Sequence, residues 1–272
     1  MKKQYIFLLI FLGGMIFTAC DENNDITEAP DLAVVECFLT PGKVPDTVKI
    51  SNILSYSSEE TDTEWISNLN VVLIHNEISF PLLESEVPGH YVCPENTLII
   101  EEGETYRLEF EYNDKQLTAE TIVPEIPREF NASDDTYYFP TMGSGGPGSM
   151  DDGIELTWNV EENITYYLKI ENIETDPELA MEFMIEDDST NMPETSRITQ
   201  PSSDDFYSIT MRNVSYLGTH RVILYAVTED YARMNEQNGT SSISLTDPYT
   251  NVENGYGLFS AFATDTLYFE VE

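Results

Sequence analysis

Apolar and polar residues alternate along much of the chain after residue 31, and this period of two predicts strands. The clearest case is Thr105–Tyr112, where three aromatic residues and Leu108 alternate with Arg107 and two glutamates. Lys115–Val123 alternates again after Asn113-Asp114, two residues that tolerate positive φ and suit a tight turn. The two segments therefore predict a hairpin with one buried face.

Similar short segments fill the rest of residues 31–124, and their spacing predicts a β-sandwich there. Pro124–Pro127 follows as a stiff connector, because proline fixes φ and has no backbone donor, and it is the predicted boundary between two units. The further strands expected in the first unit are Leu32–Thr40, Thr47–Ile50, Asn70–His75, Ile78–Leu82 and Gly89–Cys93.

Residues 128–272 predict a second unit of the same kind, an immunoglobulin- or fibronectin-III-like sandwich with Trp158 in its core. Gly143–Ser149 carries too many glycines for a packed element and predicts a loop. One short helix interrupts the strands, since Thr228 suits its start and Asn238-Gly239 suits its end. The predicted class is all-β. The strands expected in this unit are Ile154–Trp158, Tyr166–Ile170, Leu179–Ile185, Phe206–Met211, His220–Val227, Ile243–Leu245 and Thr266–Val271.

The first residues have the order of a bacterial export signal. Lys2-Lys3 is followed by the apolar run Tyr5–Phe17, and small residues precede Cys20. The run is shorter than the roughly 20 apolar residues that span a bilayer. We therefore predict a lipoprotein signal peptide over residues 1–19, with acyl chains on Cys20 as the membrane anchor. An ordinary cleaved signal is the alternative. Residues 20–30 are acidic and predict an extended tether.

Charge and cysteine content narrow the classes of function. Removal of the signal leaves 10 basic and 50 acidic residues, a formal charge of −40, which excludes binding to nucleic acid because phosphate is repelled. With Cys20 acylated, only Cys37 and Cys93 remain. In an exported protein they could form a disulfide that closes a loop of about 56 residues. Two separate buried thiols are the equal alternative.

The sequence offers no catalytic constellation. It contains no Gly-x-Ser-x-Gly turn or phosphate-binding glycine loop, and His75, His90 and His220 lack the spacing of zinc ligands. We therefore expect no catalytic residue and no cofactor, and interpret the histidines as structural. Acidic loops suit calcium, so a structural calcium ion stays open. The paired acids are Glu59-Glu60, Asp134-Asp135, Asp151-Asp152, Asp187-Asp188 and Asp204-Asp205.

Gly255 and Gly257 flank Tyr256 near the end of the chain. Glycines in a strand allow another backbone to approach closely, and this is the reading that we favour. The alternative is that they present Tyr256 to a partner.

Four segments together resemble outer-membrane lipoproteins of Bacteroidetes-type bacteria, grouped as domain-of-unknown-function family 4249. They are Val34–Thr40, Pro88–Tyr91, Glu102–Leu108 and Glu253–Phe259. The resemblance implies an accessory lipoprotein beside a TonB-dependent transporter, facing the cell surface. Three further segments are similar to the O-glycosylation acceptor pattern of such bacteria: Asp46–Val48, Asp188–Thr190 and Asp265–Leu267.

These observations predict a non-enzymatic protein, lipid-anchored in the outer membrane, that binds an unknown small-molecule ligand or assists a TonB-dependent nutrient transporter. A structural or adhesive surface module is the second reading. The third, a carbohydrate-active enzyme, requires two carboxylates facing each other across a sugar, which adjacent acids in a loop do not establish.

Overall fold

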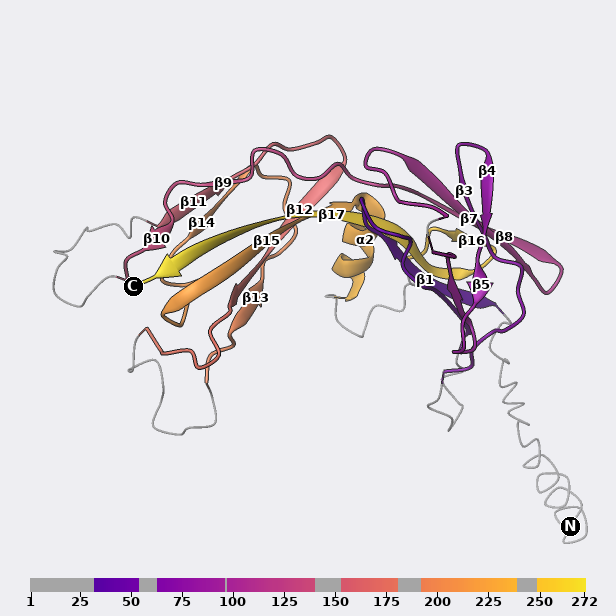
Figure 1. Cartoon of the computed structure of the whole chain (residues 1–272), viewed down its shortest axis with the longest axis horizontal. Coiled ribbons are helices and arrows are strands. Elements are labelled where there is room, and N and C mark those ends of the chain that lie inside the picture. Colours follow the sequence, from indigo (N-terminus) through magenta and orange to yellow (C-terminus); the bar gives the residue numbers. More distant parts are fainter. Residues whose placement is uncertain (1–31, 54–62, 96, 140–152, 181–191, 239–248) are drawn as a thin grey trace, which may run out of the picture.

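The computed structural model describes residues 32–53, 63–95, 97–139, 153–180, 192–238 and 249–272 (Figure 1). Within them the chain is nearly all β-strand with one short helix, so the predicted all-β class is confirmed. The signal peptide, Cys20 and the acidic tether lie outside the described residues, as does the glycine-rich segment Gly143–Ser149. None of the described helices is long and apolar enough to cross a membrane.

The strands of the described residues form three sheets. The N-terminal sheet has the order β16 (Val252–Glu253), β8 (Lys115–Ile122), β7 (Thr105–Tyr112), β3 (Val72–His75) and β4 (Ile78–Pro81). The small sheet has the order β14 (Phe206–Ile209), β11 (Ile154–Thr157) and β9 (Asn131–Ala132).

The long sheet runs through the whole molecule (Figure 1). Its order is β13 (Ser196–Ile198), β12 (Ile164–Asn172), β15 (Gly218–Thr228), β17 (Tyr256–Val271), β1 (Ala33–Leu39), β2 (Val48–Asn52), β6 (His90–Val92) and β5 (Leu83–Glu84), with β10 (Thr136–Tyr137) paired to the end of β17.

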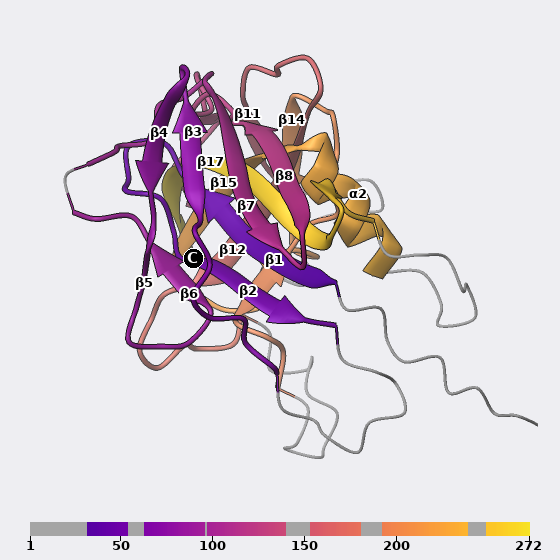
Figure 2. The same cartoon turned by 90° about the vertical axis from the view of Figure 1, so that its right-hand side faces the viewer.

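Two hydrophobic cores lie on this sheet within the described part of the chain. The first is enclosed between β1, β2 and β6 and the N-terminal sheet, whose strands cross those of β1 and β2 (Figure 2). It holds the alternate residues of the predicted hairpin, among them Tyr106, Leu108 and Phe110. The second core lies between β12, β15 and β17 and the small sheet, and Trp158 belongs to it as predicted.

Strand β17 is shared by both cores. Its first residues pair in parallel with β1, from Val34 opposite Tyr256 to Leu39 opposite Ala261. Its remainder pairs antiparallel with β15, from Phe262 opposite Val227 to Val271 opposite Gly218. Before the connector at Pro124–Pro127 the buried residues belong to the first core, up to Val123, and after it the second core begins at Phe130. However, residues 252–261 of the predicted second unit return to the first core, because β17 enters it beside β1.

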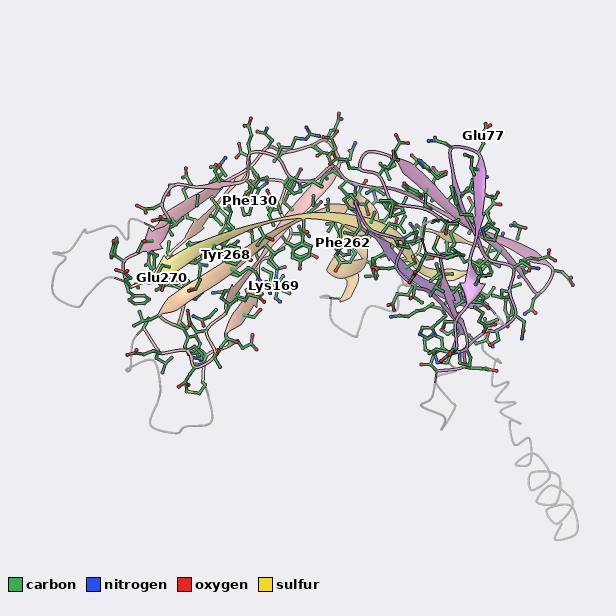
Figure 3. The ribbon with its side chains drawn as sticks, viewed as in Figure 1. Glu77, Phe130, Lys169, Phe262, Tyr268 and Glu270 are labelled. Atoms are coloured by element: carbon green, nitrogen blue, oxygen red, sulfur yellow. The ribbon has the colours of Figure 1, made fainter. Side chains whose placement is uncertain are left out.

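The helix α2 (Glu229–Asn238) forms where the sequence predicts it. It lies beneath the middle of the long sheet (Figure 1). Tyr231 packs edge-on against Phe38 of β1, with ring centroids 5.9 Å apart. Phe38 also contacts Phe262 of β17. Figure 3 shows Phe262 below the long sheet, where the two cores adjoin. The Thr228 hydroxyl is hydrogen-bonded to that of Ser260 at 2.8 Å, so the start of the helix is attached to the shared strand.

Two predicted strands of the second unit lie largely or wholly outside the described residues. Leu179 forms only a single bridge to Tyr216, and residues 181–185 lie outside the described part. Ile243–Leu245 also lies outside it.

Candidate functional site

The two cysteines lie in the first core as separate thiols. The Cys37 thiol points to the Asp46 carbonyl oxygen at 3.9 Å, whereas Cys93 lies 3.6 Å from the Thr97 hydroxyl. Burial, with smaller contributions from the charges of Asp46 and Glu36, strongly raises the pKa of the Cys37 thiol. Of the two alternatives that the sequence left open, the structure has the unpaired thiols.

The three histidines lie in three different strands, β3, β6 and β15, and each has its own hydrogen-bonding contact. Their Nδ1 atoms lie near backbone carbonyl oxygens: His75 by Thr105 at 3.2 Å, His90 by Pro88 at 2.9 Å and His220 by Gly218 at 2.9 Å. No group of three or more His, Cys, Asp or Glu side chains in the described ranges is arranged to hold a metal ion. Structural calcium stays a prediction, since part of the acidic sequence lies outside these ranges.

Of the five pairs of acids, three lie outside the described residues and two lie within them. Glu59-Glu60, Asp151-Asp152 and Asp187-Asp188 lie outside the described residues. Asp134 accepts hydrogen bonds from the backbone of its own turn, and Asp204 accepts one from Ser202. Among the described pairs, Asp205 borders a cleft beside the small sheet and Asp204 borders the groove next to it. The acceptor-like segments behave as ordinary strand and loop residues where they are described, and their glycosylation stays a prediction.

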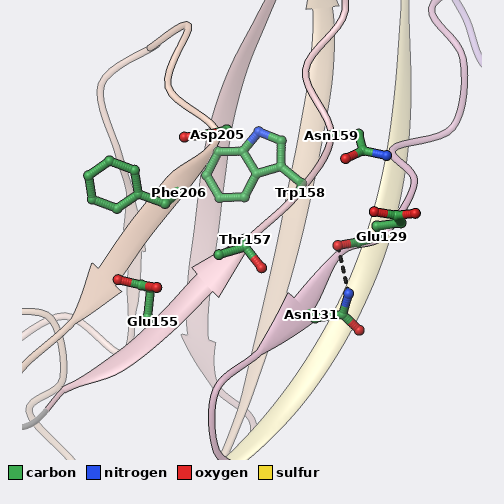
Figure 4. Close-up of a pocket in the computed structure, with 8 residues that line it drawn as sticks. All are labelled: Glu129, Asn131, Glu155, Thr157, Trp158, Asn159, Asp205 and Phe206. Atoms are coloured by element: carbon green, nitrogen blue, oxygen red, sulfur yellow. Dashed lines mark hydrogen bonds between the residues drawn. The ribbon is translucent and has the colours of Figure 1, made fainter.

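A cleft of about 480 Å³ lies on the outer face of the small sheet (Figure 4). It brings together three carboxylates, two amides and two aromatic rings from three separate segments. The residues that line it are Glu129, Asn131, Glu155, Thr157, Trp158, Asn159, Asp205 and Phe206.

Strand alternation places these residues. Ile154 and Leu156 of β11 point into the second core, so Glu155 and Thr157 face outward. The register then forms a row across the sheet, because Thr157 lies opposite Asn131 of β9 on one side and Phe206 of β14 on the other. The outer face of this sheet is therefore one continuous polar surface with an aromatic residue at its edge.

Backbone hydrogen bonds fix the ends of the cleft. Trp158 donates its backbone N–H to Asp205 at 3.0 Å, and Asn159 donates to the Arg128 carbonyl oxygen at 3.0 Å. Glu129 has a positive φ of 55°, and its carbonyl oxygen accepts a hydrogen bond from the Asn131 side chain at 2.8 Å (Figure 4). That amide thus holds in place a backbone conformation that is uncommon for a glutamate.

Within the described residues, the carboxylates of the cleft have no cationic partner. No Lys or Arg lines it, and the ion pairs of the described residues do not include Glu129, Glu155 or Asp205. Trp158 is only 6% exposed, and its Nε1–H has no acceptor within the part of the chain that the structure describes. A buried donor without a partner is unusual in a folded protein. The cleft therefore offers negative charge, whereas the indole donor is buried in the second core behind it.

A second groove, of about 350 Å³, adjoins the first and shares Trp158 and Phe206 with it. It lies between β14 and the strands β12 and β13, and Arg197 borders it. Burial raises the pKa of Tyr166 and of Tyr207 in its wall. Tyr207 also accepts a hydrogen bond from Asn213 at 2.7 Å. Phe206 thus stands between an acidic cleft and an aromatic groove.

A third hollow, of about 510 Å³, lies where the two cores meet, and its lining includes acids of β8, of the connector, of the turn before β12 and of the start of α2. Burial, followed by the charge of Glu125, raises the pKa of the Glu161 carboxyl there. A raised carboxyl pKa is what a general acid needs, but Glu161 is not in the cleft that contains the aromatic residues. The arrangement around Phe206 is accordingly suited to non-covalent binding.

The sequence analysis identified Trp158 as a core residue and Asp205 as one of a pair of acids. It did not identify Phe206, Glu129 or Glu155 as residues of a site. The outward alternation of Glu155, Thr157 and Asn159 was a visible signal. Its meaning depends on β9 and β14, which local sequence does not connect to β11. Tyr256, the aromatic residue considered for display, instead lies in β17 opposite Val34.

Comparison with known proteins adds little about activity. A cytokine receptor complex is similar to this chain at a TM-score of 0.31 and 10% identity, over 86% of this chain and 94% of that one. The FN1–FN3 domains of chicken CNTN1 are similar at a TM-score of 0.26 and 11% identity, over 87% of this chain and 69% of that one. No curated protein matches. The family described as Domain of unknown function (DUF4249) matches residues 22–267, and the chain therefore belongs to that family.

Proposed function

We propose that this protein is a non-enzymatic binding lipoprotein, anchored by Cys20 in the outer membrane and facing the cell surface, that assists a TonB-dependent transporter in nutrient uptake. The observation that carries the binding role is the cleft around Phe206, where carboxylates without an ion-pair partner in the described part of the chain lie beside an exposed ring. Convergent polar groups beside aromatic surface are typical of ligand sites. The anchor rests on the order of charge, apolar run and cysteine in residues 2–20.

The anchor is tested by changing Cys20. We expect the unchanged protein to incorporate radiolabelled palmitate and to fractionate with outer membranes. The Cys20→Ala variant should do neither, because it lacks the thiol that is acylated. If that variant still fractionates with membranes, or if the unchanged protein takes up no label, the anchoring part of the proposal is wrong.

The transporter is tested by crosslinking in intact cells followed by solubilisation and purification of the protein. We expect a TonB-dependent transporter among the crosslinked partners and growth on a limiting nutrient to fall when the gene is deleted. Repeated failure to recover any such transporter would remove this partner from the proposal while leaving the anchor untouched.

A structural or adhesive role is the second candidate, and the continuity of β17 favours it. One strand that passes through both cores makes a stiff connection, which suits a module that holds a binding tip away from the membrane. Deletion of the gene separates the two roles: loss of attachment with normal growth supports adhesion, and loss of growth with normal attachment supports uptake.

A further inference from the structure

We propose that the outer face of the small sheet, with the free edge of β14, binds an extended peptide that carries lysine or arginine side chains. This inference rests on the proposed binding function, since it names the ligand class of the same cleft. It follows from three features: the charge, the exposed ring and the open strand edge.

The negative charge of the cleft favours a cationic ligand. Glu129, Glu155 and Asp205 line the cleft without an ion-pair partner among the described residues, in a mature chain of formal charge −40. An anionic ligand would be repelled both locally and by the whole molecule. An ammonium or guanidinium group would gain charge-assisted hydrogen bonds to these carboxylates. The ligand is therefore positively charged where it meets the cleft.

The exposed ring favours an organic cation over a small ion. Phe206 is 52% exposed and lies opposite Thr157, so that Glu155 is its diagonal neighbour across β11 and β14. A cation held by Glu155 comes within reach of that ring face, and cation–π attraction acts within about 6 Å of the ring centroid. The three carboxylates do not form a cluster that could hold a metal ion, in the part of the chain that is described.

The backbone favours a peptide over a simple amine. Among the described strands β14 pairs only with β11, so its other edge presents N–H and C=O groups to the adjoining groove. An extended peptide can add to such an edge, with alternate side chains directed to either face. A polyamine supplies charge but has no peptide groups that could pair with a strand edge.

Binding can be followed through Trp158 itself. The chain has two tryptophans, so in a Trp65→Phe background the fluorescence reports the wall of the cleft alone. The acylated protein in non-ionic detergent is titrated with a peptide of alternating glycine and lysine. The comparison ligands are the same peptide with glutamine in place of lysine, spermidine, and maltotriose. We expect saturable binding of the lysine peptide and markedly weaker binding of the other three.

Two variants locate the site. Glu155→Gln removes one charge at nearly constant shape and should weaken binding of the lysine peptide about 2- to 5-fold, as expected for an exposed ion pair. Phe206→Ala should weaken it by a similar factor through loss of the cation–π contact. Both side chains are exposed, so the fold should be retained, which the thermal transition of each variant checks.

Matched controls distinguish a site from general attraction to an acidic protein. Glu111→Gln makes the same charge change on β7, and Tyr268→Ala removes an exposed ring from β17, both away from the cleft. Neither should change the affinity. The proposal is overturned if Glu111→Gln weakens binding as much as Glu155→Gln, if spermidine binds as tightly as the peptide, or if maltotriose binds better. None of these results alters the tests of the anchor and transporter.

Discussion

The backbones of Val35 and Gly257 lie so close that a Cβ on Gly257 would overlap the Val35 carbonyl oxygen. The two residues are partners in the parallel register of β1 and β17. Gly257 also has a φ of 102°, which side chains rarely allow. The close approach expected from the glycines around Tyr256 is thus confirmed, and it occurs where the shared strand enters the first core.

The first prediction concerns this glycine. Gly257→Ala should lower the free energy of unfolding by more than about 3 kcal/mol, because strain at positive φ is added to a clash with rigid backbone. Gly103→Ala is the matched control, since Gly103 has a φ of 74° but nothing within 4 Å of its Cβ position. It should cost only about 1–2 kcal/mol. Urea titration of both variants measures the difference, and equal losses would contradict the importance of the contact.

The second prediction is that both cores unfold together, because β17 and the long sheet join them. Each core contains or borders one tryptophan, Trp65 on the first and Trp158 in the second. In Trp65→Phe the fluorescence of Trp158 should follow the same urea transition as far-ultraviolet circular dichroism, and in Trp158→Phe the fluorescence of Trp65 should do so. Two separate transitions in either variant would show that the cores are independent.

The third prediction concerns the thiols. In the unfolded Cys20→Ala chain, without reductant, two thiols should react with a colorimetric thiol reagent, because the structure has Cys37 and Cys93 unpaired. In the folded chain Cys37 should react only as fast as the protein opens. Its side chain is buried and its raised pKa keeps the reactive thiolate scarce. A count of no thiols after unfolding would indicate a disulfide instead.

The fourth prediction is a pH dependence that comes from His220. Burial lowers the pKa of this imidazole below its ordinary value of 6.5, and the smaller opposing contributions come from Gly218, Glu270 and Glu174. The unfolded chain therefore takes up the proton first as pH falls. The neutral buried imidazole contributes its full stability above about pH 6.5, and this contribution is lost as pH falls towards the folded pKa.

His220→Asn tests the sign, because asparagine keeps a donor near the Gly218 carbonyl oxygen but does not titrate in this range. The difference in unfolding free energy between the original protein and this variant should shrink when the pH is lowered from 7.5 to 5. A difference that grows instead would mean that the folded state favours the charged imidazole. Taking the difference cancels the acids that titrate equally in both.

Local sequence determined the elements of this protein. The alternation around Tyr106 and Leu108 identified the buried face of β7, and Asn113-Asp114 became a turn with φ values of 51° and 57°. The helix α2 begins and ends where its flanking residues predicted. These features follow from a few neighbouring residues, because side-chain period and turn conformation are local properties. The order of charge and apolar residues before Cys20 is local in the same sense.

The tertiary structure decided which strands meet. Nothing near Phe206 indicates that it lies beside Thr157 and, through it, Asn131, yet this row forms the cleft. Likewise, the sequence predicted a last strand only over Thr266–Val271, although β17 begins at Tyr256 and its first part completes the core of the first unit. Pairing between distant strands depends on register and on the burial of both faces at once. The sequence therefore determined the strands and their inner faces, and only the folded sheet decided the shared strand and the cleft.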